Sequence, residues 1–283
     1  MSIKKYLFLG LIGLTIICSY LVCHMSQAKE APDHFIKIYS FYQAEEALAS
    51  LKEGDVVFFD VDDTLLSSRD LWARQFNPPF WFKVAALARY PRALYDLSFG
   101  EAIFSKMLLK APRFVVEPEV KELIKELRAK GVIVMVITGM ETGPFGLISN
   151  LPAWRASMLE GLGIQLEKSF KDTSFNNFPT HRKNYPGLYQ GLLCCNQRPK
   201  GEVMAAFLKY ANLRPATVVH FDDTPEELVS SKNALQSFGF DIKGFYYTRA
   251  AAITHPYWTV RRGLKQLVHL VEHDSWLPDE KVE

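Results

Sequence analysis

Three short runs of hydrophobic residues stand out along the chain, at residues 55–60, 132–138 and 217–222. Each run is nearly continuous, is rich in β-branched or aromatic side chains, and is bounded by turn-forming residues. Strands that are buried on both faces of a sheet have this pattern, because neither face has to meet water. We therefore predict three interior strands.

Segments with helical periodicity follow these strands. Residues 117–130, 201–213 and 225–238 repeat hydrophobic positions three and four apart, and Pro225 stands where the third helix is expected to begin. Alternating strands and helices imply right-handed crossover connections. We predict an α/β fold with a doubly wound, mostly parallel, Rossmann-like sheet, in which ligands bind at the carboxyl ends of the strands.

Two segments interrupt this alternation. Residues 66–115 are rich in aromatic residues and proline, and we interpret them as a helical cap inserted after the first strand. Residues 140–198 form a second, irregular insertion with a helix expected near 153–162. The predicted core then consists of residues 29–65 and 116–283.

The first 28 residues have the pattern of an export signal. Lys4 and Lys5 precede a hydrophobic stretch over residues 6–23 that contains no acidic side chain. Ser26-Gln27-Ala28 offers small residues to a signal peptidase, so we expect cleavage after Ala28 and a periplasmic or secreted protein. The alternative is an uncleaved membrane anchor, although the stretch barely reaches the roughly 20 residues that span a bilayer.

The composition is that of an ordinary globular protein, with 48% hydrophobic and 23% charged residues among 283. The formal net charge is +2, and cleavage after Ala28 leaves the mature chain without net charge. This balance gives no reason to expect nucleic acid as a partner, or a membrane beyond the export segment. Cys194 and Cys195 are adjacent, which excludes a disulfide framework, and we expect them to be buried strand residues.

Acidic side chains collect where the three predicted strands end. The first strand leads into Asp-Val-Asp-Asp-Thr at residues 60–64, the second into Thr-Gly at 138–139, and the third into Asp-Asp-Thr at 222–224. Carboxylates brought together at one edge of a parallel sheet repel one another unless they bind a cation. Oxygen ligands of this kind favour magnesium over zinc or copper.

Lys200 adds a positive charge at the predicted start of a helix. Carboxylates, magnesium, a hydroxyl beside a glycine amide and a lysine together make a receptor for phosphate, and the matching reaction is phosphoryl transfer. An aspartate at a strand end can then act as the nucleophile and form an aspartyl-phosphate.

Over roughly residues 54–250, these motifs and their order resemble the haloacid dehalogenase superfamily. The resemblance implies that Asp60 is the nucleophile and a magnesium ligand. It implies that Asp62 is the general acid and base and offers its backbone carbonyl to the metal. Dehalogenases of the superfamily lack the second aspartate, whereas its phosphatases and phosphotransferases have it, so Asp62 favours a phosphate substrate. Exported acid phosphatases and secreted bacterial proteins of the superfamily share the export signal.

The same resemblance gives roles to the remaining motifs. Thr138 would hold a phosphoryl oxygen together with the amide of Gly139, and Lys200 would neutralise the nucleophile and the phosphoryl group. Asp222 would bind magnesium, with Asp223 as a direct or water-mediated ligand. Glu226 and Glu227 lie where many members have a further acidic residue, and which of them contributes stays open.

Two other motifs have a simpler interpretation. Residues 60–71 begin like a calcium-binding loop, but Leu65 and Leu71 stand where that loop needs glycine and glutamate. His269 and His273 belong to an inverted zinc-peptidase motif, yet no later acidic ligand can be placed with it. His220 lies within a strand and is expected to be a core residue.

The sequence therefore predicts an exported magnesium-dependent phosphatase that hydrolyses a small phosphate monoester. Two alternatives stay open. One is an exported binding or host-interaction protein that keeps the fold, and the other is a phosphotransferase. The sequence does not identify the substrate, a protein partner or the oligomeric state.

Overall fold

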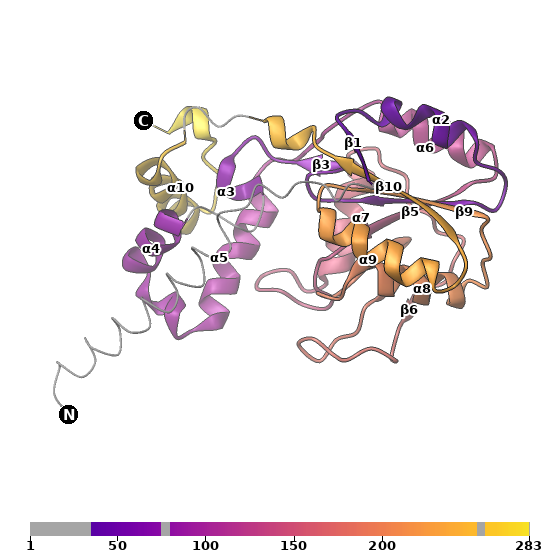
Figure 1. The fold of residues 1–283 in the computed structure, drawn as a ribbon. Helices are drawn as coiled ribbons and strands as arrows, with labels where there is room; N and C mark the ends of the chain where they lie inside the picture. Colours follow the sequence, from indigo (N-terminus) through magenta and orange to yellow (C-terminus); the bar gives the residue numbers. More distant parts are fainter. Residues whose placement is uncertain (1–34, 75–79, 254–257, 283) are drawn as a thin grey trace.

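The computed structural model describes residues 35–74, 80–253 and 258–282, so the predicted export signal at residues 1–28 lies outside the described residues. Within these ranges, eight strands form one sheet in the order β1-β10-β9-β2-β5-β8-β7-β6 (Figure 1). The strands are β1 (Ile36–Ile38), β10 (Asp241–Tyr247), β9 (Thr217–Asp222), β2 (Val56–Asp60), β5 (Ile133–Thr138), β8 (Leu192–Cys194), β7 (Gly187–Tyr189) and β6 (Thr173–Ser174).

In this order, each pair of neighbouring strands from β1 through β10, β9, β2 and β5 to β8 is parallel. The β8-β7 and β7-β6 pairs at the edge of the sheet are antiparallel. The predicted α/β class, with a doubly wound and mostly parallel Rossmann-like sheet, is therefore confirmed. The three interior strands predicted from the hydrophobic runs are β2, β5 and β9, which lie side by side in the middle of the sheet.

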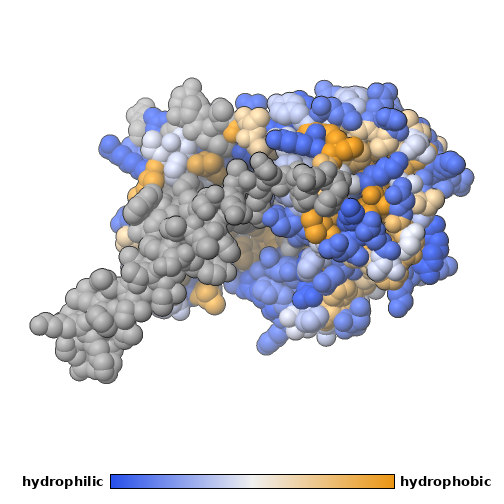
Figure 2. Space-filling model, in the orientation of Figure 1, coloured by the Kyte–Doolittle hydropathy of each residue, from blue (hydrophilic) through white to orange (hydrophobic). Residues whose placement is uncertain are grey.

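Helices cover both faces of the sheet because alternate strand residues are buried on opposite sides. Val57 and Phe59 of β2 pack with the helices η1, α2, α6 and α7, whereas Val56 and Phe58 pack with α8 and α9. The helices are η1 (Phe41–Ala44), α2 (Glu45–Ala49), α6 (Val120–Ala129), α7 (Leu151–Gly161), α8 (Lys200–Tyr210) and α9 (Pro225–Gln236). On the face seen in Figure 2, hydrophilic residues dominate this lobe and hydrophobic ones lie in small separate groups.

The cap is a separate lobe of helices beside the sheet (Figure 1). The chain enters it through β3 and leaves it through β4, which pair with each other in an antiparallel ribbon. Its elements are β3 (Leu66–Ser67), α3 (Leu71–Arg74), α4 (Phe80–Arg89), η2 (Pro91–Leu94), α5 (Leu97–Lys110) and β4 (Phe114–Val115). The expected helical insertion after the first strand is thus present.

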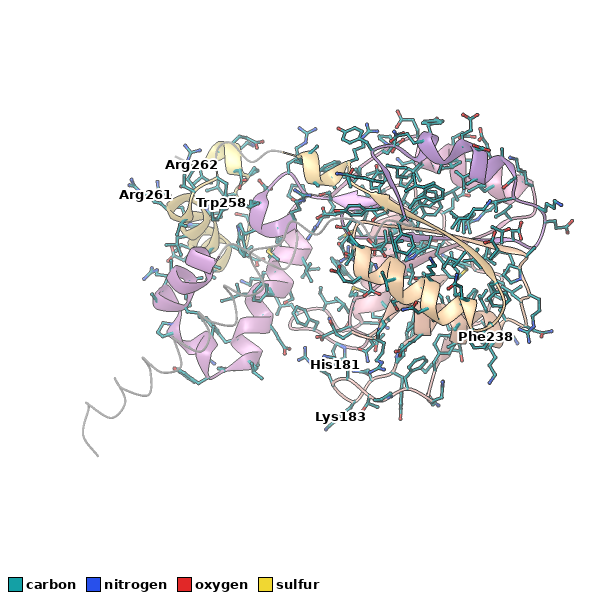
Figure 3. All side chains as sticks on the ribbon, viewed as in Figure 1. His181, Lys183, Phe238, Trp258, Arg261 and Arg262 are labelled. Carbon is teal, nitrogen blue, oxygen red and sulfur yellow. The ribbon has the colours of Figure 1, made fainter. Side chains whose placement is uncertain are left out.

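The C-terminal segment belongs to this lobe as well, which changes the expected assignment of residues 116–283 to the core. Helix α10 (Val260–His273) packs against α4 and α5, and Figure 3 shows Trp258, Arg261 and Arg262 near its start in the cap lobe. Leu267 and Leu270 are buried with Trp72 and Met107 of the cap. A helix of this kind is amphipathic in sequence, but sequence alone does not say which surface its apolar face covers.

Residues 140–198 are more regular than the sequence suggests. They supply α7, and they supply β8, which pairs with β5 and extends the sheet by a hairpin with β7. These strands have three residues each, too few for a periodic pattern to be recognised. Cys194 ends β8, and both cysteines are buried and free, with the pKa of each thiol raised by burial.

Among the residues that the structure describes, no helix is long and apolar enough to cross a membrane.

Candidate active site

The carboxyl ends of β2, β5 and β9 bring the predicted residues together. Lys200 links two of these ends directly, because its Nζ atom lies 2.6 Å from Oδ1 of Asp60 and 2.6 Å from Oδ2 of Asp222. All three side chains are buried. Residues that are 140 and 22 positions from Lys200 in sequence thus meet at one point, as the parallel sheet requires.

The start of α8 holds Lys200 in this position. Its backbone N–H donates to Oε2 of Glu227 on α9, at 2.8 Å. The two helices approach closely at Gly201, where a Cβ atom would lie 2.2 Å from the carbonyl oxygen of Ser230. Glu227, which the sequence left undecided beside Glu226, therefore supports the lysine and also lines the cavity described below.

The charges of the three groups are strongly interdependent. Burial raises the pKa of Asp60 well above its ordinary value, and the charges of Asp222 and Asp223 add to this against the effect of Lys200. Burial alone would raise the pKa of Asp222, but contacts with Lys200 and His220 lower it. Burial opposes the charge of Lys200, yet the two carboxylates raise its pKa well above the usual range. Lys200 therefore keeps its positive charge at ordinary pH.

Asp223 is the third carboxylate of the cluster. Burial, followed by the charge of Asp222, raises its pKa to about 7. One oxygen each from Asp60, Asp222 and Asp223 lie within 4.8 Å of one another. Three carboxylates beside one lysine leave an excess of negative charge, and their oxygens are the ligands that magnesium prefers. The three carboxylates therefore fit the predicted cation, and Asp62, which is predicted to offer its backbone carbonyl to the metal, lies outside this carboxylate cluster.

His220 is buried in β9, as predicted for a core histidine. Its Nδ1 atom lies 3.0 Å from Oγ of Ser231, and its Nε2 atom lies 3.1 Å from Oδ2 of Asp222. Burial lowers its pKa, so the ring is neutral at pH 7. The histidine therefore contacts the Asp222 carboxylate without adding a charge.

Asp62 lies just beyond β2 and contacts a residue that the sequence did not reveal. Nη1 of Arg155, on α7, donates to Oδ1 of Asp62 at 3.0 Å. Arg155 is fully buried, whereas the Asp62 side chain is 30% exposed. No motif surrounds Arg155 in the sequence, and only the folded position of α7 brings it to the site.

The turn between β2 and the cap is held by its own hydrogen bonds. Asp63 has a left-handed backbone with φ of 63°, and its N–H donates to the carbonyl oxygen of Leu66 at 2.7 Å. Its carboxylate accepts from Ser67 at 2.6 Å and from Nε of Arg74 at 3.0 Å. Asp63 therefore shapes the turn that presents Asp60 and Asp62, which explains why a third aspartate stands in this motif.

A cavity of about 540 Å³ opens over these groups. Its polar end includes Asp60, Asp62 and Lys200, with Thr138 and Gly139 at the end of β5. Its apolar wall is formed by side chains from the cap and from the segment after β5, which belong to one hydrophobic cluster. These are Leu108, Met140, Phe145 and Leu151.

Ion pairs join the cap to the rim of this cavity. Arg182, on the loop between β6 and β7, contacts Glu101 of α5 and donates to Glu141 at 2.9 Å. His181, seen with Lys183 on the same loop in Figure 3, also contacts Glu141, which lines the cavity. Gly146 approaches α5 so closely that a Cβ atom would lie 2.3 Å from the carbonyl oxygen of Glu101. The cap and the 140–198 segment thus form a common wall.

The structure defines an α/β protein with carboxylates and a lysine at the carboxyl edge of a mostly parallel sheet, and the order of these motifs resembles that of the haloacid dehalogenase superfamily. More specifically, the chain belongs to the family described as "Protein of unknown function (DUF2608)", whose model matches residues 37–267.

Relatives and one solved structure resemble the chain over most of its length. Uncharacterized protein RP296 of Rickettsia prowazekii is 21% identical over 72% of this chain and 73% of the relative. An uncharacterized protein of Rickettsia bellii is 24% identical over 86% and 83%. The HAD domain of effector protein Lem4 from Legionella pneumophila, an inactive mutant, matches 79% of this chain and 96% of that domain, with 12% identity and a TM-score of 0.39.

Proposed function

We propose that the protein is an exported, magnesium-dependent phosphatase that hydrolyses a small phosphate monoester through an aspartyl-phosphate intermediate. The observation that carries this proposal is the position of Lys200 between Asp60 and Asp222, at the polar end of a cavity that also contains Asp62 and Thr138. A nucleophile, a proton donor and fixed donors for phosphoryl oxygens therefore face one space.

Magnesium would be held by Asp60, Asp222 and Asp223, and when bound it supplies positive charge to the carboxylates and to the phosphoryl oxygens. The other groups on the chain have separate tasks. Lys200 offsets the charge of Asp60, so that its carboxylate can approach an anionic phosphate. Thr138 and Gly139 line the cavity, and the Thr138 hydroxyl and the Gly139 amide would donate hydrogen bonds to a phosphoryl oxygen.

The reaction then has two balanced steps. In the first, a carboxylate oxygen of Asp60 attacks phosphorus, the bond from phosphorus to the ester oxygen breaks, and Asp62 gives a proton to the departing alcohol. In the second, water attacks the same phosphorus and loses a proton to Asp62, and the bond from phosphorus to the Asp60 oxygen breaks. Inorganic phosphate leaves, and Asp60 and Asp62 regain their starting states.

The apolar wall supports a monoester whose alcohol part has some hydrophobic surface. The cavity is much larger than a phosphate group needs, and Leu108, Phe145 and Leu151 line it together with the charged groups. Contact with such side chains contributes about 25 cal/mol for each Å² of apolar surface removed from water.

Hydrolysis of 4-nitrophenyl phosphate with magnesium tests the proposal, using wild type and the Asp60→Asn variant. We expect Asp60→Asn to lower kcat by about a thousandfold or more, because the amide cannot form the phosphoenzyme. Asp241→Asn, at the exposed start of β10, is the matched control and should keep full activity.

Unchanged turnover in Asp60→Asn would contradict the proposal. Magnesium binding without hydrolysis across a broad panel of phosphate esters would support a binding protein instead. Transfer of phosphate to an added alcohol would identify a phosphotransferase.

A further inference from the structure

The contact between Arg155 and Asp62 joins a fully buried guanidinium group to a carboxylate that is 30% exposed. The Arg155 side chain has no exposed surface, and its Nε and Nη2 atoms are buried without a hydrogen-bond partner among the described residues. Burying a guanidinium group is costly, and an apolar side chain of similar size is often equally stable or more so at such a position. A need for the charge at this point would explain why arginine is present.

We propose that Arg155 is a positioning residue that orients Asp62 for proton transfer to the departing alcohol. This inference rests on the proposed phosphatase function and extends it to a residue outside the motifs at the strand ends. Arg155 donates to Oδ1 of Asp62, while Oδ2 has no partner within the described part of the chain. Asp62 lines the cavity, so its second oxygen is available to exchange a proton there.

Arg155 is suited to this task because its position is rigid. Helix α7 begins after Asn150, whose side chain accepts the N–H of Ala153 at 3.0 Å. Ala156 and Leu159 anchor the helix in the core beside the sheet. The guanidinium lies 5.1 Å from the ring of Trp154. A guanidinium also stays protonated at ordinary pH, so it fixes the carboxylate without competing for the transferred proton.

A second arginine lies nearby but does not make this contact. The charges of Asp62 and Arg155 both influence the pKa of Arg113, which burial lowers to about 10. The Nη1 atom of Arg113, however, donates to the backbone carbonyl of Arg74 at 3.2 Å. The hydrogen bond to Asp62 therefore comes from Arg155.

The test compares two substrates with different leaving groups, 4-nitrophenyl phosphate and an alkyl phosphate, in Arg155→Met. An alkoxide leaves poorly without a proton, whereas 4-nitrophenolate leaves readily, so misplacing Asp62 harms the alkyl ester more. We expect kcat/KM, which reports the steps up to departure of the alcohol, to fall about 100-fold for the alkyl ester and less than about 10-fold for the aryl ester. Arg155→Lys should restore part of the loss. If Arg155→Met does not fold, Arg155→Lys carries the test, with the same difference between substrates at smaller amplitude.

A double-mutant cycle separates positioning from a general structural effect. If Arg155 acts through Asp62, adding Arg155→Met to Asp62→Asn should lower kcat no further. Arg128→Met is the matched control, because Arg128 is a largely buried arginine whose Nη2 atom donates to the carbonyl oxygens of Val134 and Gln165. It should affect stability and leave the ratio of the two rates unchanged.

The role of Arg155 would be overturned if Arg155→Met lost the same activity on both esters, or if its effect multiplied with that of Asp62→Asn in the double variant. Either result would leave the phosphatase proposal intact. A folded wild-type protein that hydrolyses neither ester would overturn both.

Discussion

At the scale of single residues, the site is defined by an imbalance of charge. Three carboxylates, of buried Asp60 and Asp222 and of partly buried Asp223, lie beside one ammonium group, that of Lys200. The lysine fixes two of them by direct contact and leaves Asp223 with its raised pKa. The site is therefore stable only when a proton or a second cation supplies the missing positive charge.

Replacing Lys200 by methionine should destabilise the metal-free protein by about 3–5 kcal/mol, because two buried carboxylates lose their shared partner. Chemical denaturation in the presence of EDTA measures this loss. Magnesium should restore more stability to this variant than it adds to wild type, since it replaces the missing charge. Lys209→Met, at the exposed end of the same helix, is the control and should change little. Equal stability of wild type and Lys200→Met would show that the ion pairs contribute nothing.

Magnesium affinity should weaken as pH falls below about 7, by up to about tenfold per pH unit, because the metal must displace the proton from Asp223. Calorimetric titration at pH 6 and pH 8 measures the change, and Asp223→Asn should flatten it.

In the metal-free protein, the stability of the folded state changes with pH in the opposite direction. The folded state binds a proton between pH 7 and 4 that the unfolded chain releases, so the contribution of Asp223 to stability is lost as pH rises through 7.

At the scale of elements, the sequence predicts the parts whose pattern is local. The runs that become β2, β5 and β9 are continuous enough to be recognised, and their ends carry the motifs that meet in the site. Arg155 could not be predicted in this way. Its role depends on α7 packing beside β8, and β8 is a three-residue strand without a periodic signal.

The apolar wall of the cavity is also an element-scale feature, because it combines Leu108 of α5 with Phe145 from the segment after β5. Phe145→Ala should raise KM for an aryl phosphate about tenfold and change kcat less than threefold, since the lost contact binds ground state and transition state alike. The inhibition constant of inorganic phosphate should stay constant. Leu147→Ala, on an exposed side chain of the same segment, is the control. A loss confined to kcat would contradict this role.

At the scale of the whole molecule, the cap lobe is assembled from two distant parts of the chain. Asp70, near the entry to the lobe, accepts hydrogen bonds from Nε1 of Trp276 and from the N–H of Asp279, each at 2.7 Å. Both contacts join the entry segment to the segment after α10. Sequence analysis could not find this arrangement, because the two segments share no motif and are separated by more than 200 positions.

Asp70→Ala should therefore loosen the cap while the sheet stays intact. The buried N–H of Asp279 and the partly buried Nε1 of Trp276 lose their acceptor, at a cost of about 1–3 kcal/mol for the buried donor and less for the other. Hydrogen exchange should become faster in α10 and α4 and remain slow in β2 and β5. Asp274→Ala is the control, because its ion pairs with Lys106 and Lys110 are solvent-exposed and contribute little. Faster exchange throughout the sheet would mean that the two lobes unfold together.

The two-part cap also limits how this protein can change. Leu267 and Leu270 of α10 pack on Trp72 and Met107, so residues 66–115 are not an interchangeable module. A graft of that insertion alone would place a foreign surface against α10 and leave its apolar side without a complementary neighbour. Replacement of the whole cap must therefore change both segments in concert, and chimaeras that retain the fold will be those that exchange the pair.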